Sequence, residues 1–281
     1  MEKLHFKITA ENNLNLLQTK TLSGGDINTV FLLKCEEGNF VIKLNDASRF
    51  PRMFEAEAKG LNLLRDSDSF RIPEIISNGA IEGTSYLLME FLQDGNKTKN
   101  FWSQFASHLA KLHKNSQSYF GLDHDNYIGS LHQTNLKCIS ASEFFISQRL
   151  QPQFRMASEN GFNFKDLEKF YKNISEEIPK EPSSLIHGDL WGGNYMVSEE
   201  GRPTLIDPAV AFAPREMDLA MMKLFGGFDN VVFTTYNEIF PLTDGWTDRH
   251  ALWQLYYLLV HLNLFGSGYL NRVKSIVSNY S

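Results

Sequence analysis

The first third of the chain carries short apolar runs separated by polar turns. The segment "NFVIKLN" (39–45) has the apolar run of a buried strand. "QTKTLSGGDINTVFLLKC" (18–35) predicts two strands joined by a Gly-containing turn, and "IPEIIS" (72–77) and "TSYLLMEFL" (84–92) predict two more. We therefore expect a small β-rich unit at the start of the chain.

One stretch of this third follows the helical period instead. Residues 50–66, "FPRMFEAEAKGLNLLRD", predict a helix, and Pro51 suits its start. The apolar residues on its predicted buried stripe are Met53, Phe54, Ala58, Leu61 and Leu64.

The pattern changes after the polar segment "QDGNKTKN" (93–100), where we place a lobe boundary. Helical patterns then dominate in residues 101–115, 140–161 and 163–178, and again toward the C-terminus. Strands and tight loops interrupt them at 184–208. The predicted fold class is α+β with two lobes, a β-rich nucleotide-binding lobe at 1–92 and a helical catalytic and substrate lobe at 93–281. Ligands often bind in the cleft between two such lobes.

Composition narrows the function classes. The 281 residues carry a net charge of −6, which argues against a nucleic-acid or anionic-membrane binder. The first residues lack the apolar segment of a signal peptide, and no run is long enough for a membrane span. Two cysteines make neither a disulfide framework nor a zinc site. We expect a cytoplasmic protein, with its oligomeric state open and a monomer favoured.

The candidate chemistry lies in "LIHGDLWGGNYM" (185–196) and "GRPTLIDPAVAF" (201–212). The strands "YMV" and "PTLI" can pair as a hairpin, which would bring Asp207 beside the loop that carries Asp189 and Asn194. Three oxygen-bearing side chains would then converge. Such a set suits Mg²⁺, which takes one or two carboxylates together with phosphate oxygens and water.

This spacing matches the needs of phosphoryl transfer. A loop Asp accepts the proton of the attacking hydroxyl, and an Asn five residues later and a second Asp hold magnesium on the nucleotide. We assign the first role to Asp189 and the metal-binding roles to Asn194 and Asp207. Gly188 stands where a protein kinase has Arg, and "IDPA" stands where it has D-F-G. Both departures favour a small-molecule kinase.

The β-rich lobe offers the nucleotide-binding parts. Gly24 and Gly25 in "SGGDIN" could cover the phosphates with backbone N–H groups, although such a Gly pair is also common in hairpin turns. Lys43 lies mid-strand among apolar residues and needs an anionic partner. Glu57 is its expected partner, with Glu55 as the alternative, and Lys43 would then contact the phosphates of ATP.

Other candidates rest on position. Backbone groups of Glu90, Phe91 and Leu92 could read the adenine edge at the hinge. Trp191 lies between the presumed base and the magnesium Asn, so we place it at the substrate mouth, with a core role as the alternative. The structural-support candidates are His187, expected to pack under the loop, and Asp218, expected to hold the loop backbone.

These motifs resemble those of the fructosamine kinase family, also called ketosamine-3-kinases. "HGDLWGGN", "LIDPA" and "REMDLAMMKLFGGF" carry the resemblance, and "LSGGDIN", "FVIKLN" and "MFEAEAKGLNLL" match in order and spacing. It spans residues 16 to 280. Related aminoglycoside and choline kinases share the Asp, Asn and Asp but generally lack "LWGGN" joined to "DLAMMKLFGGF".

The resemblance implies a protein-kinase-like fold of the aminoglycoside phosphotransferase type. It also implies ATP- and Mg²⁺-dependent phosphorylation of a sugar hydroxyl on a small-molecule or protein-bound ketosamine. In that family the 3-phosphate destabilises the sugar–amine adduct and frees the amine, which is deglycation repair. Some members carry a redox-active Cys in the Gly-rich loop. The loop here has none, so we do not expect that switch.

Two alternatives stay open at the level of sequence. The first is another small-molecule kinase of this fold, acting on an aminoglycoside, choline or homoserine. A cationic substrate would need an acidic pocket, to which Asp123, Asp125, Glu216 and Asp218 could contribute. The second is a catalytically silent nucleotide-binding module.

Overall fold

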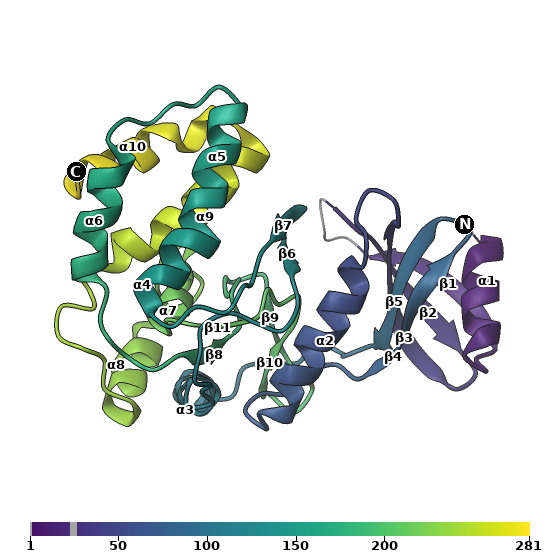
Figure 1. Ribbon diagram of the computed structural model, residues 1–281. Helices are drawn as coiled ribbons and strands as arrows, with labels where there is room; N and C mark the ends of the chain where they lie inside the picture. Colours follow the sequence, from purple (N-terminus) through teal and green to yellow (C-terminus); the bar gives the residue numbers. More distant parts are fainter. Residues whose placement is uncertain (1, 23–26) are drawn as a thin grey trace.

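The computed structural model describes residues 2–22 and 27–281, and it consists of a sheet-based part and a larger helical part (Figure 1). The sheet has five antiparallel strands in the order β1-β2-β3-β5-β4. Its strands are β1 (Leu16–Leu22), β2 (Thr29–Cys35), β3 (Gly38–Asp46), β4 (Ile75–Ile81) and β5 (Thr84–Glu90). The predicted strands of the first third are therefore confirmed.

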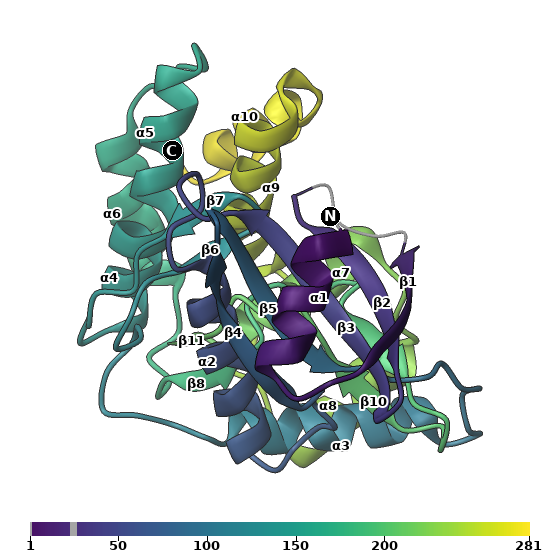
Figure 2. The ribbon, with the colours of Figure 1, turned by 90° about the vertical axis from the view of Figure 1, so that its right-hand side faces the viewer.

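Two helices cover opposite faces of this sheet (Figure 2). On one face, Ile8 of α1 (Glu2–Glu11) packs on Ile42 and Leu44 of β3. On the other, α2 (Met53–Asp66) packs its buried apolar stripe against Leu87 of β5. Side chains alternate between the faces of a strand, so Lys43 points to the same face as α2. The pleat of β3 thereby brings a lysine to the helix that carries Glu57.

The sequence analysis missed α1, because residues 2–11 read poorly as a helix. Leu4, Phe6 and Ile8 alternate with polar residues, as in a strand, and the helix has only a weak amphipathic stripe. Phe6 stays 57% exposed, while Ile8 is buried. The start of α2 also differs from our expectation, because Pro51 lies in a turn and the helix begins at Met53.

The larger part is helical, as predicted. Its core surrounds α9 (His250–Phe265), which is buried along most of its length and carries the fully buried Trp253. The surrounding helical segments are α3 (Phe101–His113), α4 (Ala141–Phe144), the π-helical turn η1 (Phe145–Leu150), α5 (Gln151–Glu159), α6 (Leu167–Glu177), α7 (Glu216–Phe225), α8 (Asn230–Ile239), the 3₁₀ turn η2 (Ser267–Tyr269) and α10 (Leu270–Asn279). The boundary at residues 92 and 93 falls in the segment between β5 and α3 and stays a prediction.

Three pairs of short strands interrupt these helices. β9 (Tyr195–Val197) and β10 (Pro203–Leu205) form the hairpin expected from "YMV" and "PTLI". β11 (Ala211–Ala213) pairs with β8 (Ser184–Ile186). The sequence analysis did not predict the third pair, the hairpin of β6 (Asn126–Ile128) and β7 (Leu131–Gln133).

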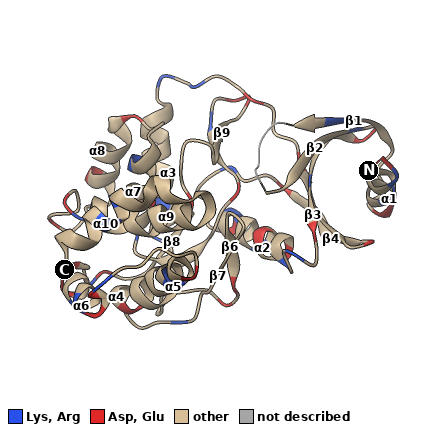
Figure 3. Ribbon diagram, turned by 90° about the horizontal axis from the view of Figure 1, so that it is seen from above, with Lys and Arg blue, Asp and Glu red and all other residues tan. Residues whose placement is uncertain are grey.

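Acidic and basic positions are interspersed along both parts of the fold (Figure 3). Cys35 and Cys138 are buried and unpaired with each other. Within residues 2–22 and 27–281, no helix combines the length and apolar character that crossing a bilayer requires.

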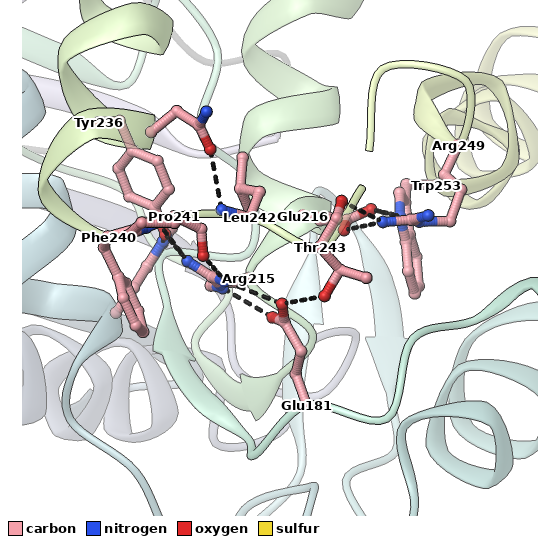
Figure 4. Close-up of polar contacts among 12 residues, drawn as sticks. Glu181, Arg215, Glu216, Tyr236, Phe240, Pro241, Leu242, Thr243, Arg249 and Trp253 are labelled. Carbon is pink, nitrogen blue, oxygen red and sulfur yellow. Dashed lines mark hydrogen bonds and ion pairs between the residues drawn. The ribbon is translucent and has the colours of Figure 1, made fainter. Parts of the chain in front are cut away.

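Two buried ion pairs fix the start of α7 (Figure 4). Arg215 binds Glu181 through Nε and Nη2 at 2.7 and 2.8 Å, and it also donates to the carbonyls of Phe240 and Pro241. Glu216, 1% exposed, accepts from Arg249 Nη2 at 2.6 Å and from Trp253 Nε1 at 2.7 Å. The sequence analysis did not place Arg215 and Glu216 in the core. They connect α7 to α9 and to the loop that precedes α9.

We expect Glu216→Ala to lower the free energy of unfolding by about 3–5 kcal/mol, because it leaves the buried Arg249 guanidinium without its carboxylate. Glu200→Ala is the matched control, since its ion pair with Arg202 is solvent-exposed, and it should cost less than about 1 kcal/mol. Urea unfolding of both variants measures the difference. Equal losses would contradict the anchoring role of Glu216.

Candidate active site

Lys43 lies between two carboxylates, and this arrangement organises the site. Its Nζ is 2.6 Å from Glu57 Oε1 and also contacts Asp207 Oδ1. Burial opposes the charge of Lys43, but Asp207 and Glu57 outweigh it and raise the pKa of Lys43 above its usual value. Glu55 binds Arg52 and Lys59 on the outer side of α2 instead. Of the two candidate partners, the structure therefore pairs Lys43 with Glu57.

Asp207 adopts an unusual backbone conformation. Its φ is +54°, in the left-handed region that a non-glycine residue occupies at a cost of about 1–3 kcal/mol. The residue lies two positions after the end of the hairpin strand β10, and the turn aims its carboxylate back at Lys43. Asn194 supports the turn by donating from Nδ2 to the carbonyl of Asp207 at 3.4 Å, and Ile206 N–H donates to the carbonyl of Asn194 at 3.1 Å.

Asn194 also binds the loop that carries Asp189. Its Nδ2 donates to the Asp189 carbonyl at 2.8 Å and to Oδ2 of the same residue at 3.1 Å. The structure thus brings Asp189, Asn194 and Asp207 together through one buried amide group. Their convergence was the central structural expectation from the sequence.

The buried carboxylate of Asp218 holds the backbone before Asp189. It accepts from the N–H groups of His187 and Gly188 at 2.8 and 2.9 Å. The His187 ring lies under the loop, completely buried, with Nε2 2.9 Å from the Ile206 carbonyl and Nδ1 accepting from Asp189 N–H at 3.3 Å. Burial lowers the pKa of His187, so the neutral ring makes both contacts. Both residues therefore lie where a supporting role for the loop requires them.

The glycine at 188 has a steric cause. Its φ is +83°, and a Cβ there would lie 2.0 Å from the carbonyl oxygen of Ala209. That close approach accompanies the hydrogen bond from Ala209 N–H to the His187 carbonyl at 2.9 Å. An arginine at this position would not fit the observed backbone.

Two of the Gly-Gly pairs of the sequence, Gly192–Gly193 and Gly226–Gly227, meet in space. A Cβ on Gly227 would lie 3.2 Å from the Cα of Gly192, so the loop after α7 packs on the loop after Asp189. A Cβ on Gly193 would lie 2.3 Å from the ring of Trp191, which explains the second glycine of "WGG". The Trp191 ring therefore lies over the backbone of Gly193 in its own loop, and 42% of its surface is exposed.

Two cavities meet at Asp189 and Trp191. The smaller, about 200 Å³, is bordered by Lys43, Glu57, Asn194 and Asp207. The larger, about 540 Å³, is mainly apolar and is bordered by Phe225, Tyr257, His261 and Phe265 of α7 and α9. A group bound in one cavity would face a group bound in the other across the Asp189 carboxylate.

The position of Asp189 changes its acidity. Its burial raises the pKa of Asp189 to about 7, although the hydrogen bond from Asn194 opposes the rise, and the nearby charges of Asp207 and Asp218 add to it. A carboxyl group with such a pKa can accept a proton near neutral pH. The side chain remains half-buried, at the mouth of both cavities.

The donor set of the smaller cavity fits a hard divalent cation. The Asn194 amide nitrogen is directed at Asp189 and Asp207, and no hydrogen bond occupies its Oδ1 among residues 2–22 and 27–281. The Asp207 side chain is 48% exposed and keeps a second carboxylate oxygen beside the one that Lys43 contacts. One amide oxygen and one carboxylate match the few protein ligands that Mg²⁺ takes beside phosphate oxygens.

The hinge candidates lie apart from these cavities. The Glu90 side chain binds Arg71, and its N–H donates to the Glu74 carbonyl at 2.8 Å. Phe91 N–H donates to the Asn39 carbonyl at 3.3 Å. Both amides are therefore engaged. In the described part of the chain, Leu92 N–H has no hydrogen-bond partner, so it is the amide of the three that remains available for a ligand.

Two expectations cannot be placed. Gly24 and Gly25 fall within residues 23–26 and lie outside the described residues.

The sequence analysis missed the wall of the larger cavity formed by Tyr257, His261 and Phe265, because residues 252–265 have the apolar pattern of a buried helix. The available signal was His261, a polar residue within that apolar run.

The fold and the site together define a two-lobed phosphotransferase of the kinase type. The sequence profile of fructosamine kinase matches residues 3–281, so the chain belongs to the fructosamine kinase family. It is 39% identical to a probable ketoamine kinase of Enterococcus faecium, covering 92% of this chain and 93% of that one. It is 33% identical to a chloroplastic protein-ribulosamine 3-kinase of Arabidopsis thaliana, covering 92% and 81%.

Solved structures agree with this placement. A Haemophilus somnus protein named for fructosamine-3-kinase superposes with a TM-score of 0.89 at 27% identity, covering 98% of this chain and 95% of the other. A spectinomycin phosphotransferase shares the fold at 16% identity, with a TM-score of 0.61 and coverage of 98% and 91%. The predicted two-lobed kinase-like fold is confirmed.

We expect Gly188→Ala to destabilise the protein by more than about 2 kcal/mol and to abolish activity, because the new Cβ collides with a backbone carbonyl. Gly161→Ala is the control. Gly161 has a similar φ of +86° but no atom near its Cβ position, so it should cost only about 1 kcal/mol. The free energy of unfolding and the steady-state rate of both variants are measured, and the difference between their losses is the steric contribution at Gly188. Similar losses would leave φ strain as the whole cause.

Proposed function

We propose that this protein is an ATP-dependent kinase that phosphorylates a sugar hydroxyl of ketosamines and so promotes their deglycation. The main observation behind the proposal is the position of Asp189 between a smaller cavity bordered by the charges of Lys43, Glu57 and Asp207 and a larger, mainly apolar cavity. Membership of the fructosamine kinase family and the ketoamine and ribulosamine kinase relatives support the substrate class.

In this proposal the smaller cavity receives the phosphates of ATP. Lys43 holds the α- and β-phosphates as a fixed positive charge, and Glu57 orients it. Asn194 and Asp207 would hold Mg²⁺, which neutralises negative charge on the phosphates. Leu92 N–H is the hinge amide available to the adenine, and the expected contribution of Gly24 and Gly25 stays a prediction.

The larger cavity receives the acceptor. Asp189 takes the proton of the sugar hydroxyl, and the hydroxyl oxygen of the sugar attacks the γ-phosphorus of ATP. The new O–P bond forms as the bond to the β-phosphate oxygen breaks, and ADP leaves. Trp191 forms one side of the sugar pocket. The fixed placement of both substrates supplies most of the rate, as expected for this chemistry.

The number of acidic residues that line the larger cavity helps to distinguish a ketosamine from the cationic alternative substrates. Of the four carboxylates considered for a cationic substrate, Glu216 and Asp218 are buried in structural contacts. Asp123 and Asp125 border a separate cavity beside His124 and His132. Asp189 is the one acidic residue among the described residues that line the larger cavity. A substrate with several ammonium groups, such as an aminoglycoside, fits this cavity poorly, whereas aromatic walls can still face a single amine.

The test is phosphate transfer from ATP with Mg²⁺ to a panel of a ribulosamine, a fructosamine, choline and kanamycin. We expect turnover of at least one ketosamine. Asp189→Ala should lower kcat by at least about 100-fold, because the hydroxyl loses its proton acceptor, and should leave ATP affinity within about twofold.

The wild-type panel separates the alternatives. Activity on choline or kanamycin alone would overturn the ketosamine proposal and leave the kinase assignment intact. ATP binding with no transfer to any member of the panel would favour the silent module. Loss of ATP binding in Asp189→Ala would contradict its role as a proton acceptor.

The raised pKa of Asp189 gives a pH prediction. A proton acceptor works only in its ionised form, so kcat/KM for the acceptor should fall as pH drops through the raised pKa, about tenfold per unit. The inflection should lie above the ordinary carboxyl range and up to about pH 7. Rate profiles from pH 5 to 8 measure it, with ATP affinity over the same range as the control. A flat profile down to pH 5 would contradict the prediction.

A further inference from the structure

The β6–β7 hairpin crosses between the two parts of the molecule. It follows α3 in the chain, yet β6 lies against α2 of the sheet-based part (Figures 1 and 2). Gly129 at its tip comes close to both parts, because a Cβ there would lie 3.1 Å from Leu264 of α9 and 3.5 Å from Ile27 beside β2.

Buried amides anchor the hairpin to the segment after Asp207. Asn126 Nδ2 donates to the Val210 carbonyl at 2.8 Å, and Gln133 Nε2 donates to Asn126 Oδ1 at 2.7 Å. Tyr256 of α9 donates its hydroxyl to Gln133 Oε1. These four residues are at most 4% exposed. The hairpin is therefore bound to Val210, three residues beyond Asp207, through buried hydrogen bonds.

On its other side the hairpin holds the start of α2. The Tyr127 hydroxyl donates to the Pro51 carbonyl at 3.0 Å. The Tyr127 ring also meets the ring of the buried Phe50 edge-on, with centroids 6.5 Å apart. Pro51 lies two residues before α2 and six before Glu57. A displacement at Pro51 would therefore be carried into the first turns of the helix that bears Glu57.

The hairpin thus joins the two segments whose carboxylates flank Lys43. We propose that Tyr127 is a positioning residue for phosphoryl transfer: its contact with Pro51 fixes α2 against the Asp207 segment and so keeps Glu57 and Asp207 on opposite sides of Lys43. The inference rests on the proposed function, in which Lys43 binds the phosphates of ATP. Tyr127 also borders the smaller cavity, but its hydroxyl is bound to the Pro51 carbonyl, so in this scheme it acts through α2 and Glu57.

A second contact supports the same geometry from the middle of α2. Gly60 lies directly over Val210, where an added Cβ would meet Val210 Cγ2 at 3.0 Å. Gly60 allows the close approach of α2 to the segment after Asp207 and fixes one point of the helix against that segment. The hydrogen bond of Tyr127 lies nine residues earlier in the chain, at Pro51, and fixes a second point.

A double-mutant cycle tests the proposal, with Tyr127→Phe and Glu57→Gln made singly and together. The rates use whichever panel acceptor the wild-type protein phosphorylates best. We expect Tyr127→Phe to lower kcat/KM for ATP about two- to tenfold, the effect of one lost hydrogen bond. In the Glu57→Gln background the same change should cost less than about 1.5-fold, because its target is already absent.

Tyr119→Phe is the matched control. The Tyr119 ring packs edge-on against Phe212 and lies under the Lys137 ammonium group, and within the described residues no hydrogen bond or aromatic pair links Tyr119 to α2. This variant should keep the wild-type kcat/KM for ATP in both backgrounds. Thermal unfolding of every variant shows whether each one is folded.

Two results would overturn the proposal. Multiplicative effects of Tyr127→Phe and Glu57→Gln would show that Tyr127 does not act through Glu57. Wild-type kinetics of Tyr127→Phe would show that the hydrogen bond does not position α2. Failure of the proposed function gives different results, namely no transfer by the wild-type protein to a ketosamine or no effect of Glu57→Gln alone.

Discussion

The ion contacts of Lys43 are the constraint on which the site depends. A cation at 6% exposure is tolerated only when carboxylates compensate its desolvation, and here they come from two distant parts of the chain. Glu57 belongs to a helix on the sheet, whereas Asp207 follows a hairpin in the helical part. The relative placement of the two parts therefore becomes a condition for burying one charge.

Backbone proximity is the second constraint. Gly188 and Gly60 both stand where a Cβ would press on the segment of residues 208–210. Gly192 and Gly227 bring the loop after Asp189 against the loop after α7. Distance excludes a side chain at Gly188 and leaves little room at Gly60 and Gly227, and the positive φ of Gly188 and Gly227 also favours glycine. The loop that carries Asp189 is therefore bound by the Asp218 carboxylate at its start and packs against the backbone of the loop after α7, and these contacts fix the position of Asp189.

The parts of this arrangement that depend on local pattern could be predicted from sequence. The apolar strand around Lys43 and the helix after it predicted the Lys43–Glu57 pair, and the spacing of "HGDLWGGN" and "IDPA" placed Asp189, Asn194 and Asp207 near one hairpin. The parts that depend on distant packing could not. Three-residue strands such as β6 and β7 carry too few positions for a period, and α1 alternates like a strand although it docks as a helix. The wall of the larger cavity on α9 was missed because a helix that is apolar around most of its circumference gives little sign of which face borders a cavity, and His261 was the available signal.

The two cavities divide the problem of specificity. The smaller cavity is bordered by the charged side chains of Lys43, Glu57 and Asp207. Their positions are fixed by the burial of Lys43, so a substitution that changed the charge of this cavity would also disrupt the ion pairs that hold it together. The larger cavity is lined by side chains of α7 and α9; Tyr257 is part of the buried core, whereas Phe225 and Phe265 are 43% and 57% exposed. In the proposed scheme, changes at Phe225 and Phe265 would alter the fit of the acceptor while leaving the residues of the smaller cavity intact. Substrate preference would then diverge on this fold through α9 and the Gly226–Gly227 loop, with Asp189 kept as the shared boundary of both cavities.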